Sequence, residues 1–154
     1  MSLGDSCAAL ALPANRLYQE RFLRKLSKKV RAKARAMPGR IDDSHLAHIR
    51  TLVEFDECYT APLHGFASAQ DYYTRCSAGA GLRHIRVPSL LVNARNDPIL
   101  AGGCYPCDQA RDSRFFFLET PAYGGHVGFH ARGGTYWSEQ RAVAFLDRAP
   151  AGGP

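Results

Sequence analysis

The second half of the chain contains two short apolar segments, and a loop and a helical pattern follow each of them. The first segment covers residues 85–94, IRVPSLLVNA, and the second covers residues 114–120, RFFFLET. Segments that are apolar on both faces are typical of parallel strands buried on both sides of a sheet. Helical patterns follow at residues 102–111 and 136–149. The order strand, helix, strand, helix predicts parallel α/β structure.

The first half has helical patterns only. Residues 14–37 predict one long helix, because apolar side chains recur every three or four residues. That stripe consists of Leu23, Leu26, Val30, Ala34 and Met37. Shorter helices are expected over residues 42–57, with Asp43 or Ser44 as N-cap, and over residues 68–78, with Ser68 as N-cap. Between them, Pro62 and Gly65 predict a loop at residues 60–66. In the last helix, the buried side is expected to consist of Trp137, Ala142, Phe145 and Leu146.

The net charge of +6 comes from one segment of the chain. Residues 1–40 contain ten Lys and Arg against two acids, whereas residues 41–154 contain ten Arg against twelve acids. The N-terminus lacks a basic signal-peptide region, and no apolar run is long enough to cross a membrane. A cytoplasmic protein with no transmembrane segment is therefore predicted. The five cysteines are odd in number and irregularly spaced, which predicts free thiols.

Each predicted strand ends in a loop with an ionisable side chain. Asp97 lies in the loop NARNDPIL, and His126 lies in the loop YGGHVGF. In open parallel sheets, ligands bind at the carboxyl ends of the strands. If the two strands are neighbours, Asp97 can accept a hydrogen bond from one imidazole nitrogen and leave the other as a general base. Taken singly, an Asp-Pro pair is a common turn former, but the pair of loops favours a site.

Several motifs together resemble the YheT-like branch of the α/β-hydrolases, also called the AB hydrolase 4 family. They are NRLYQERFLRKLSKK, EFDECYTAPLHGFASAQDYY, IRVPSLLVNARNDPIL and GGHVGF. The resemblance implies the C-terminal portion of an α/β-hydrolase fold, with a helical cap at residues 14–80 and a core at residues 81–149. Residues 1–13 then precede the cap, and residues 150–154 form a tail. By the same resemblance, Asp97 is the triad acid and His126 the triad base of a carboxylic ester hydrolase that acts on small-molecule or lipid esters. It implies no cofactor and no metal.

The chain departs from the family pattern at two places. The family typically has two acids before the proline, and here the first position is Asn96. The nucleophile motif G-x-S-x-G is absent from the 154 residues. Ser2 and Ser6 are weak candidates, because no strand precedes Ser2 and Ala8 replaces the glycine that should follow Ser6. The sequence therefore predicts a truncated hydrolase, inactive alone, that uses an N-terminal half as partner or self-associates through an exposed sheet edge.

Other patterns leave alternatives open. The basic helix at residues 14–37 could make the chain a non-catalytic module that binds anionic lipid or nucleic acid, although a solvated cap helix is favoured and nucleic acid is not. Cys104 and Cys107 form a lone C-x-x-C motif, which is better explained by structural thiols than by zinc or redox chemistry. His64 and His130 are further candidates for the pocket.

Overall fold

The computed structural model describes residues 2–130 and 133–148, which group into two compact units. Residues 3–76 form a helical unit. Ser2 and the described residues from Ser77 onward form a second unit, which contains both strands. The expected tail at residues 150–154 lies outside the described residues. In the part of the chain that the structure describes, no helix combines the length and apolar character needed to span a membrane.

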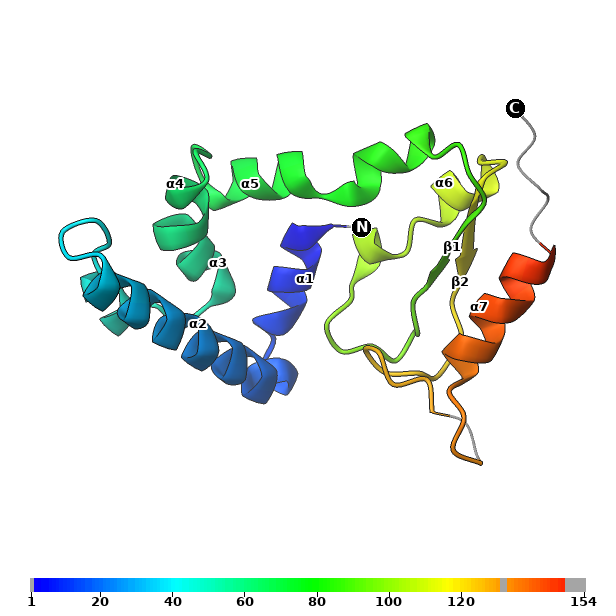
Figure 1. Cartoon of the computed structure of the whole chain (residues 1–154), viewed down its shortest axis with the longest axis horizontal. Coiled ribbons are helices and arrows are strands. Elements are labelled where there is room, and N and C mark those ends of the chain that lie inside the picture. The colour runs from blue at the N-terminus through cyan, green and yellow to red at the C-terminus, as the bar shows by residue number, and fades with distance from the viewer. Residues whose placement is uncertain (1, 131–132, 149–154) are drawn as a thin grey trace. The chain divides into compact units, whose positions relative to one another are not determined.

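The longest element of the helical unit is α2 (Arg16–Ala36), which confirms the helix predicted over residues 14–37 (Figure 1). Before it lie α1 (Leu3–Leu10), for which no element was predicted, and the 3₁₀ turn η1 (Pro13–Asn15). From the predicted stripe, Val30 is buried, and Leu23 and Leu26 pack against the same core cluster. The other buried members are Leu46, Phe55 and Tyr59. Met37 was wrongly placed in this stripe, because it lies past the end of α2 and is exposed.

The single helix expected at residues 42–57 is wrong. The chain forms a 3₁₀ turn, η2 (Ser44–Ala47), and then a new helix, α3 (Leu52–Phe55). The break has a local cause: the Asp42 carboxylate accepts hydrogen bonds from both the backbone and the hydroxyl of Ser44, which holds a turn. Neither Asp43 nor Ser44 caps α3; its N-cap is Thr51.

Thr51 and Glu54 form a reciprocal capping box at the start of α3. The Thr51 hydroxyl accepts a hydrogen bond from the Glu54 backbone N–H at 3.2 Å. The Glu54 carboxylate in turn accepts the backbone N–H groups of Thr51, at 3.1 Å, and of Arg50, at 2.6 Å. The T-x-x-E pattern that encodes this box is readable in the sequence.

The loop predicted at residues 60–66 is also mostly wrong. The π-helical turn η3 (Asp56–Thr60) leads directly into α4 (Ala61–Leu63). Pro62 directly follows this π-helical turn, where Ala61 N–H donates to Asp56 O, five residues back, so the series of i→i−4 bonds that a proline would break is already interrupted. The chain leaves the helical conformation at Gly65, whose φ is +74°. The following helix, α5 (Ala69–Cys76), is confirmed, and the Ser68 hydroxyl accepts the Asp71 N–H as an N-cap should.

The second unit contains a two-stranded parallel sheet. Strand β1 (Ser89–Val92) pairs with β2 (Phe116–Glu119), with Ser89 opposite Phe116 and Val92 opposite Glu119. The connection runs through η5 (Gly102–Cys104) and α6 (Cys107–Arg111). After β2 and its loop, α7 (Trp137–Arg148) lies beside the sheet (Figure 1). The 3₁₀ segment η4 (Ala78–His84) precedes β1. The predicted order strand, helix, strand, helix is therefore confirmed.

Burial in this unit differs from the expectation of strands buried on both sides. All four residues of β1 are only partly buried, and in β2 only Phe116 is fully buried. Helix α7 contacts the sheet through Phe145, whose ring meets the Phe117 ring edge-on. Leu146 and Ala142 were wrongly placed on its buried side, since both are exposed.

The capping box predicts a pH-dependent stability. Hydrogen bonds from the backbone N–H of Arg50, and then from Thr51, lower the pKa of Glu54 below its ordinary value. A carboxylate whose folded pKa is lowered stabilises the fold above its unfolded pKa of about 4.3, and this contribution is lost as the pH falls through the folded value. Glu54→Gln should therefore lower the melting temperature at pH 7 and leave it nearly unchanged near pH 3. Thermal unfolding followed by circular dichroism measures this.

The matched control is Glu139→Gln, which removes the same charge from the first turn of α7. Thr51→Ala should cost about 1 kcal/mol at both pH values, because it removes the hydroxyl acceptor rather than the charge. An equal effect of Glu54→Gln at pH 3 and pH 7 would contradict the assignment of the pH dependence to this carboxylate.

Candidate active site

The site lies where the two strands end. We call residues 93–98, which follow β1, the acid loop, and residues 120–130, which follow β2, the histidine loop. Backbone hydrogen bonds continue the pairing of the strands into both loops: Asn93 N–H donates to Glu119 O at 3.1 Å, and Arg95 N–H donates to Pro121 O at 2.8 Å. The parallel register therefore brings the two loops together at one edge of the sheet, as the sequence indicates.

Asp97 and His126 are in direct contact at this edge. The imidazole Nδ1 lies 2.8 Å from Oδ2 of Asp97. The Asp97 side chain is 1% exposed, whereas the His126 side chain is 50% exposed. The other carboxylate oxygen accepts the Ile99 backbone N–H at 2.8 Å, so both oxygens are occupied. An ionised carboxylate can only accept, so Nδ1 carries the proton and Nε2 is left to accept one.

Asn96 links the two loops by a second route. Its Oδ1 accepts the backbone N–H groups of Gly124, at 3.0 Å, and of Gly125, at 2.9 Å. These two glycines directly precede His126, so the Asn96 amide fixes the backbone from which the imidazole projects. The sequence analysis treated Asn96 only as a departure from the expected pattern, and this positioning role was not predicted. The sequence feature that could have indicated this role is a polar side chain directly before Asp97.

The histidine loop needs glycine at two consecutive positions. A Cβ on Gly124 would lie 2.5 Å from the Phe129 ring and 2.9 Å from Cβ of Ala94. Gly125 has a φ of +60°, in the left-handed region that glycine adopts without strain. Phe129 itself has a φ of +41°, and its N–H donates to Gly124 O at 2.9 Å. Its ring stacks on Trp137, which anchors the loop to α7.

A second layer of hydrogen bonds supports the acid loop. The buried Asn93 amide donates to the carbonyl of Cys104 at 2.7 Å, and the Tyr105 hydroxyl donates to the carbonyl of Ala94 at 2.8 Å. Burial, and then the nearby Asp97 carboxylate, raises the pKa of Tyr105. The phenol therefore stays protonated and able to donate near neutral pH.

The histidine loop has exposed apolar side chains. Tyr123 lies three residues before His126 and Val127 directly after it, and their exposed fractions are 81% and 76%. A hollow of about 330 Å³ lies against the loop, with walls that include Tyr123, Phe129 and Trp137. Over residues 2–130 and 133–148, the structure shows no group of three His, Cys, Asp or Glu side chains placed to hold a metal ion.

Of the other candidates from the sequence, His130 ends the histidine loop and lines this hollow, whereas His64 and the cysteines lie outside it. His64 belongs to the helical unit, where it ends α4. His130 packs its ring against Tyr136 at a centroid distance of 4.6 Å. All five cysteines lie within the described residues, and none forms a disulfide. In the lone C-x-x-C motif, Cys104 is buried and Cys107 is exposed.

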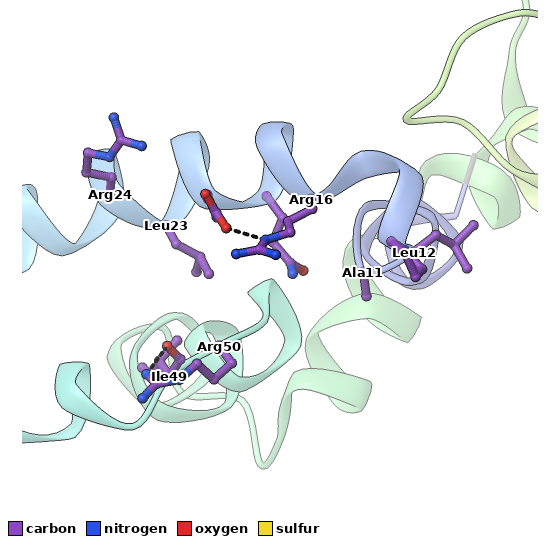
Figure 2. Close-up of a pocket in the computed structure, with 10 residues that line it drawn as sticks. Ala11, Leu12, Arg16, Leu23, Arg24, Ile49 and Arg50 are labelled. Carbon is purple, nitrogen blue, oxygen red and sulfur yellow. Dashed lines mark hydrogen bonds and ion pairs between the residues drawn. The ribbon is translucent and has the colours of Figure 1, made fainter.

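The helical unit has a groove of its own, of about 650 Å³, lined by the start of α2 and by Ile49 and Arg50. Leu23 points into it toward Ile49, whereas Arg24 points away (Figure 2). Two of the three arginines that line it have partners. Arg16 pairs with Glu20 at 2.7 Å, and Arg50 donates to the carbonyls of Ala47 and Ile49.

Comparison with known proteins shows similarity to several enzymes. YheT of Escherichia coli is 36% identical over 139 residues, which cover 86% of this chain and 40% of YheT. Monoacylglycerol lipase of Saccharomyces cerevisiae is 36% identical over 68% of this chain and 23% of its own length. Phospholipase ABHD3 of Mus musculus is 33% identical over 58% of this chain and 22% of its own. No family model and no solved structure matches the chain.

These similarities, with the parallel sheet and the loops at its edge, define the class: the chain belongs to the α/β-hydrolase family. Within that family its sequence is similar to YheT over most of its length. The chain spans less than half the length of each of these three relatives.

The close approach at Gly124 predicts the result of adding one methyl group. Gly124→Ala should destabilise the second unit by about 1–3 kcal/mol, because the Phe129 ring and Ala94 leave no room for a Cβ. Thermal unfolding, together with the chemical shifts of the His126 ring, measures this. Gly81→Ala is the matched control, since a Cβ there meets nothing within 4 Å. Equal effects of the two substitutions would contradict the close packing.

The hydrogen bonds of Asn96 lead to a separate prediction about stability and the order of the histidine loop. Asn96→Ala removes the acceptor for two backbone N–H groups and should cost about 1–2 kcal/mol, with broadened signals from the His126 ring. Asn96→Asp keeps an acceptor at the same place and should restore most of the ordered signal. If the alanine and aspartate variants behave alike, the amide oxygen does not position the histidine loop.

Proposed function

We propose that Asp97 and His126 are the acid and the base of a serine carboxylic ester hydrolase that acts on acyl or lipid esters. The observation behind this proposal is the 2.8 Å contact between a buried carboxylate and a half-exposed imidazole. The relatives support the reaction class, because their names include a monoacylglycerol lipase, a phospholipase and an ethyl ester synthase/esterase. They do not favour the alternative of a non-catalytic binding module.

In this mechanism, Nε2 of His126 takes the proton of a serine hydroxyl as the hydroxyl oxygen attacks the ester carbonyl. Asp97 holds the imidazole in the required tautomer and stabilises the imidazolium that forms. The proton passes to the leaving alcohol, and water then attacks the acyl-enzyme with His126 again as base. The apolar side chains of Tyr123 and Val127 provide a surface for the acyl or alcohol part of the ester.

The nucleophilic serine of this mechanism has no matching motif in this chain. No G-x-S-x-G occurs in the 154 residues, so we propose that a separate segment supplies the nucleophile. Ser2 is the competing candidate. It directly precedes α1, as an elbow serine precedes its helix, and its carbonyl accepts the thiol of Cys104 at 3.5 Å. Ser6 lies within α1, which does not suit a nucleophile that must stand on a turn.

The 154-residue chain alone should therefore hydrolyse p-nitrophenyl esters no faster than its His126→Ala variant. Most of the catalysis in such enzymes comes from the serine and the oxyanion hole acting with the acid and base. The assay includes Ser2→Ala. Turnover that is lost in both Ser2→Ala and His126→Ala would make Ser2 the nucleophile and refute the need for a separate segment.

The positive arm of this experiment is a chimera in which the chain replaces the matching part of Escherichia coli YheT. We expect ester hydrolysis that falls by at least about a thousandfold in His126→Ala and in Asp97→Asn. His84→Ala is the matched control, because this histidine is exposed in η4, outside both loops, and should leave the activity unchanged. An active chimera that is insensitive to His126→Ala would refute the assignment of the base.

A further inference from the structure

Helix α2 has one buried side and a broad outward side. Leu23, Leu26 and Val30 face the core of the helical unit. With 3.6 residues per turn, the remaining positions point outward. Eight basic residues in these positions are exposed: Arg21, Arg24, Lys25, Lys28, Lys29, Arg31, Lys33 and Arg35. The sequence of α2 contains a single acid, Glu20, which pairs with Arg16. The outward side is therefore strongly positive.

Large apolar side chains lie on the same outward side, in the first turns of α2. Leu17 is 80% exposed, and Tyr18 is 47% exposed. Phe22, one turn after Tyr18, is 40% exposed. Arg21 and Lys25 follow Leu17 and Tyr18 by four and by seven residues, so cationic and apolar side chains alternate over one surface.

This combination fits a lipid surface. An interfacial helix places leucine and aromatic side chains at the boundary between headgroups and acyl chains, while lysine and arginine attract anionic headgroups. Each Lys or Arg near an anionic membrane contributes about 1 kcal/mol. A nucleic acid would use the same positive charges but would gain little from an exposed leucine, because its phosphate backbone provides most of the affinity.

We propose that the outward side of α2 docks the protein on an anionic membrane surface, with Leu17 and Tyr18 entering the headgroup region. This surface is distinct from the loops of the ester-hydrolase site. Docking would hold the chain at the membrane surface, where lipid esters are found. The proposal does not depend on catalysis, because docking is measured without substrate turnover.

The experiment is vesicle flotation with the full 154-residue chain. Phosphatidylcholine vesicles are compared with vesicles that also contain about one third phosphatidylglycerol, at low and at high salt. We expect partitioning onto the anionic vesicles only, and a marked loss at high salt. Binding that is equal for neutral and anionic vesicles, or absent from both, would overturn the proposal.

Two sets of variants separate the contributions. Arg21→Gln, Lys25→Gln and Lys28→Gln together should weaken partitioning about a hundredfold, whereas Leu17→Ser with Tyr18→Ser should weaken it about tenfold. The matched control removes three exposed arginines from the other unit: Arg83→Gln, Arg111→Gln and Arg148→Gln. It should change partitioning much less, although the net charge falls equally. Circular dichroism of each variant establishes that the helices remain folded.

A duplex DNA titration completes the test. If DNA competes fully with the vesicles and the Leu17 and Tyr18 variant binds both like the unmodified chain, the surface is a general polyanion site and the membrane proposal is wrong. If the Leu17 and Tyr18 variant binds vesicles more weakly than the unmodified chain but binds DNA equally well, the insertion of Leu17 and Tyr18 is supported.

Discussion

The parallel pairing of β1 with β2 is the constraint on which the site depends. With Val92 opposite Glu119, the two strands end at the same level, and the backbone bonds from Asn93 and Arg95 extend that pairing into the loops. A shift of the register by one residue would turn the side chains of one strand to the other face and displace Asp97 from His126. The 2.8 Å contact is thus a consequence of register, supported locally by Asn96 and by the close packing at Gly124.

The parts that could be predicted from the sequence are those with a strong local signal. The period of Leu23, Leu26 and Val30 predicts α2, and the two apolar runs that end in loops predict β1, β2 and the meeting of Asp97 with His126. The predictions failed where two signals competed. At residues 42–57 the apolar pattern suggested one helix, but the Asp42 turn and the Thr51 capping box divide it. At residues 60–63, proline was interpreted as a breaker although the helical segment continues through it after the π-helical turn.

Other features depend on tertiary contacts that have no local signature. Gly124 is required by the Phe129 ring, five residues away, and by Ala94, which lies on the other loop. Likewise, the partial burial of β1 and the exposure of Leu146 follow from how α7 contacts the sheet through Phe145. A pattern of apolar residues predicts which side of an element can be buried. The extent of burial depends on the elements that pack against that side.

The neutral side chain of Asn96 also has an electrostatic consequence. The side chain at this position must accept two backbone N–H groups, which either an amide or a carboxylate oxygen can do. A carboxylate would form stronger, charge-assisted bonds but would place a second negative charge beside Asp97, and like charges at close range favour protonation of one of them. The neutral amide fixes the histidine loop without that competition. Asp97 is the carboxylate that contacts the His126 imidazole, at 2.8 Å.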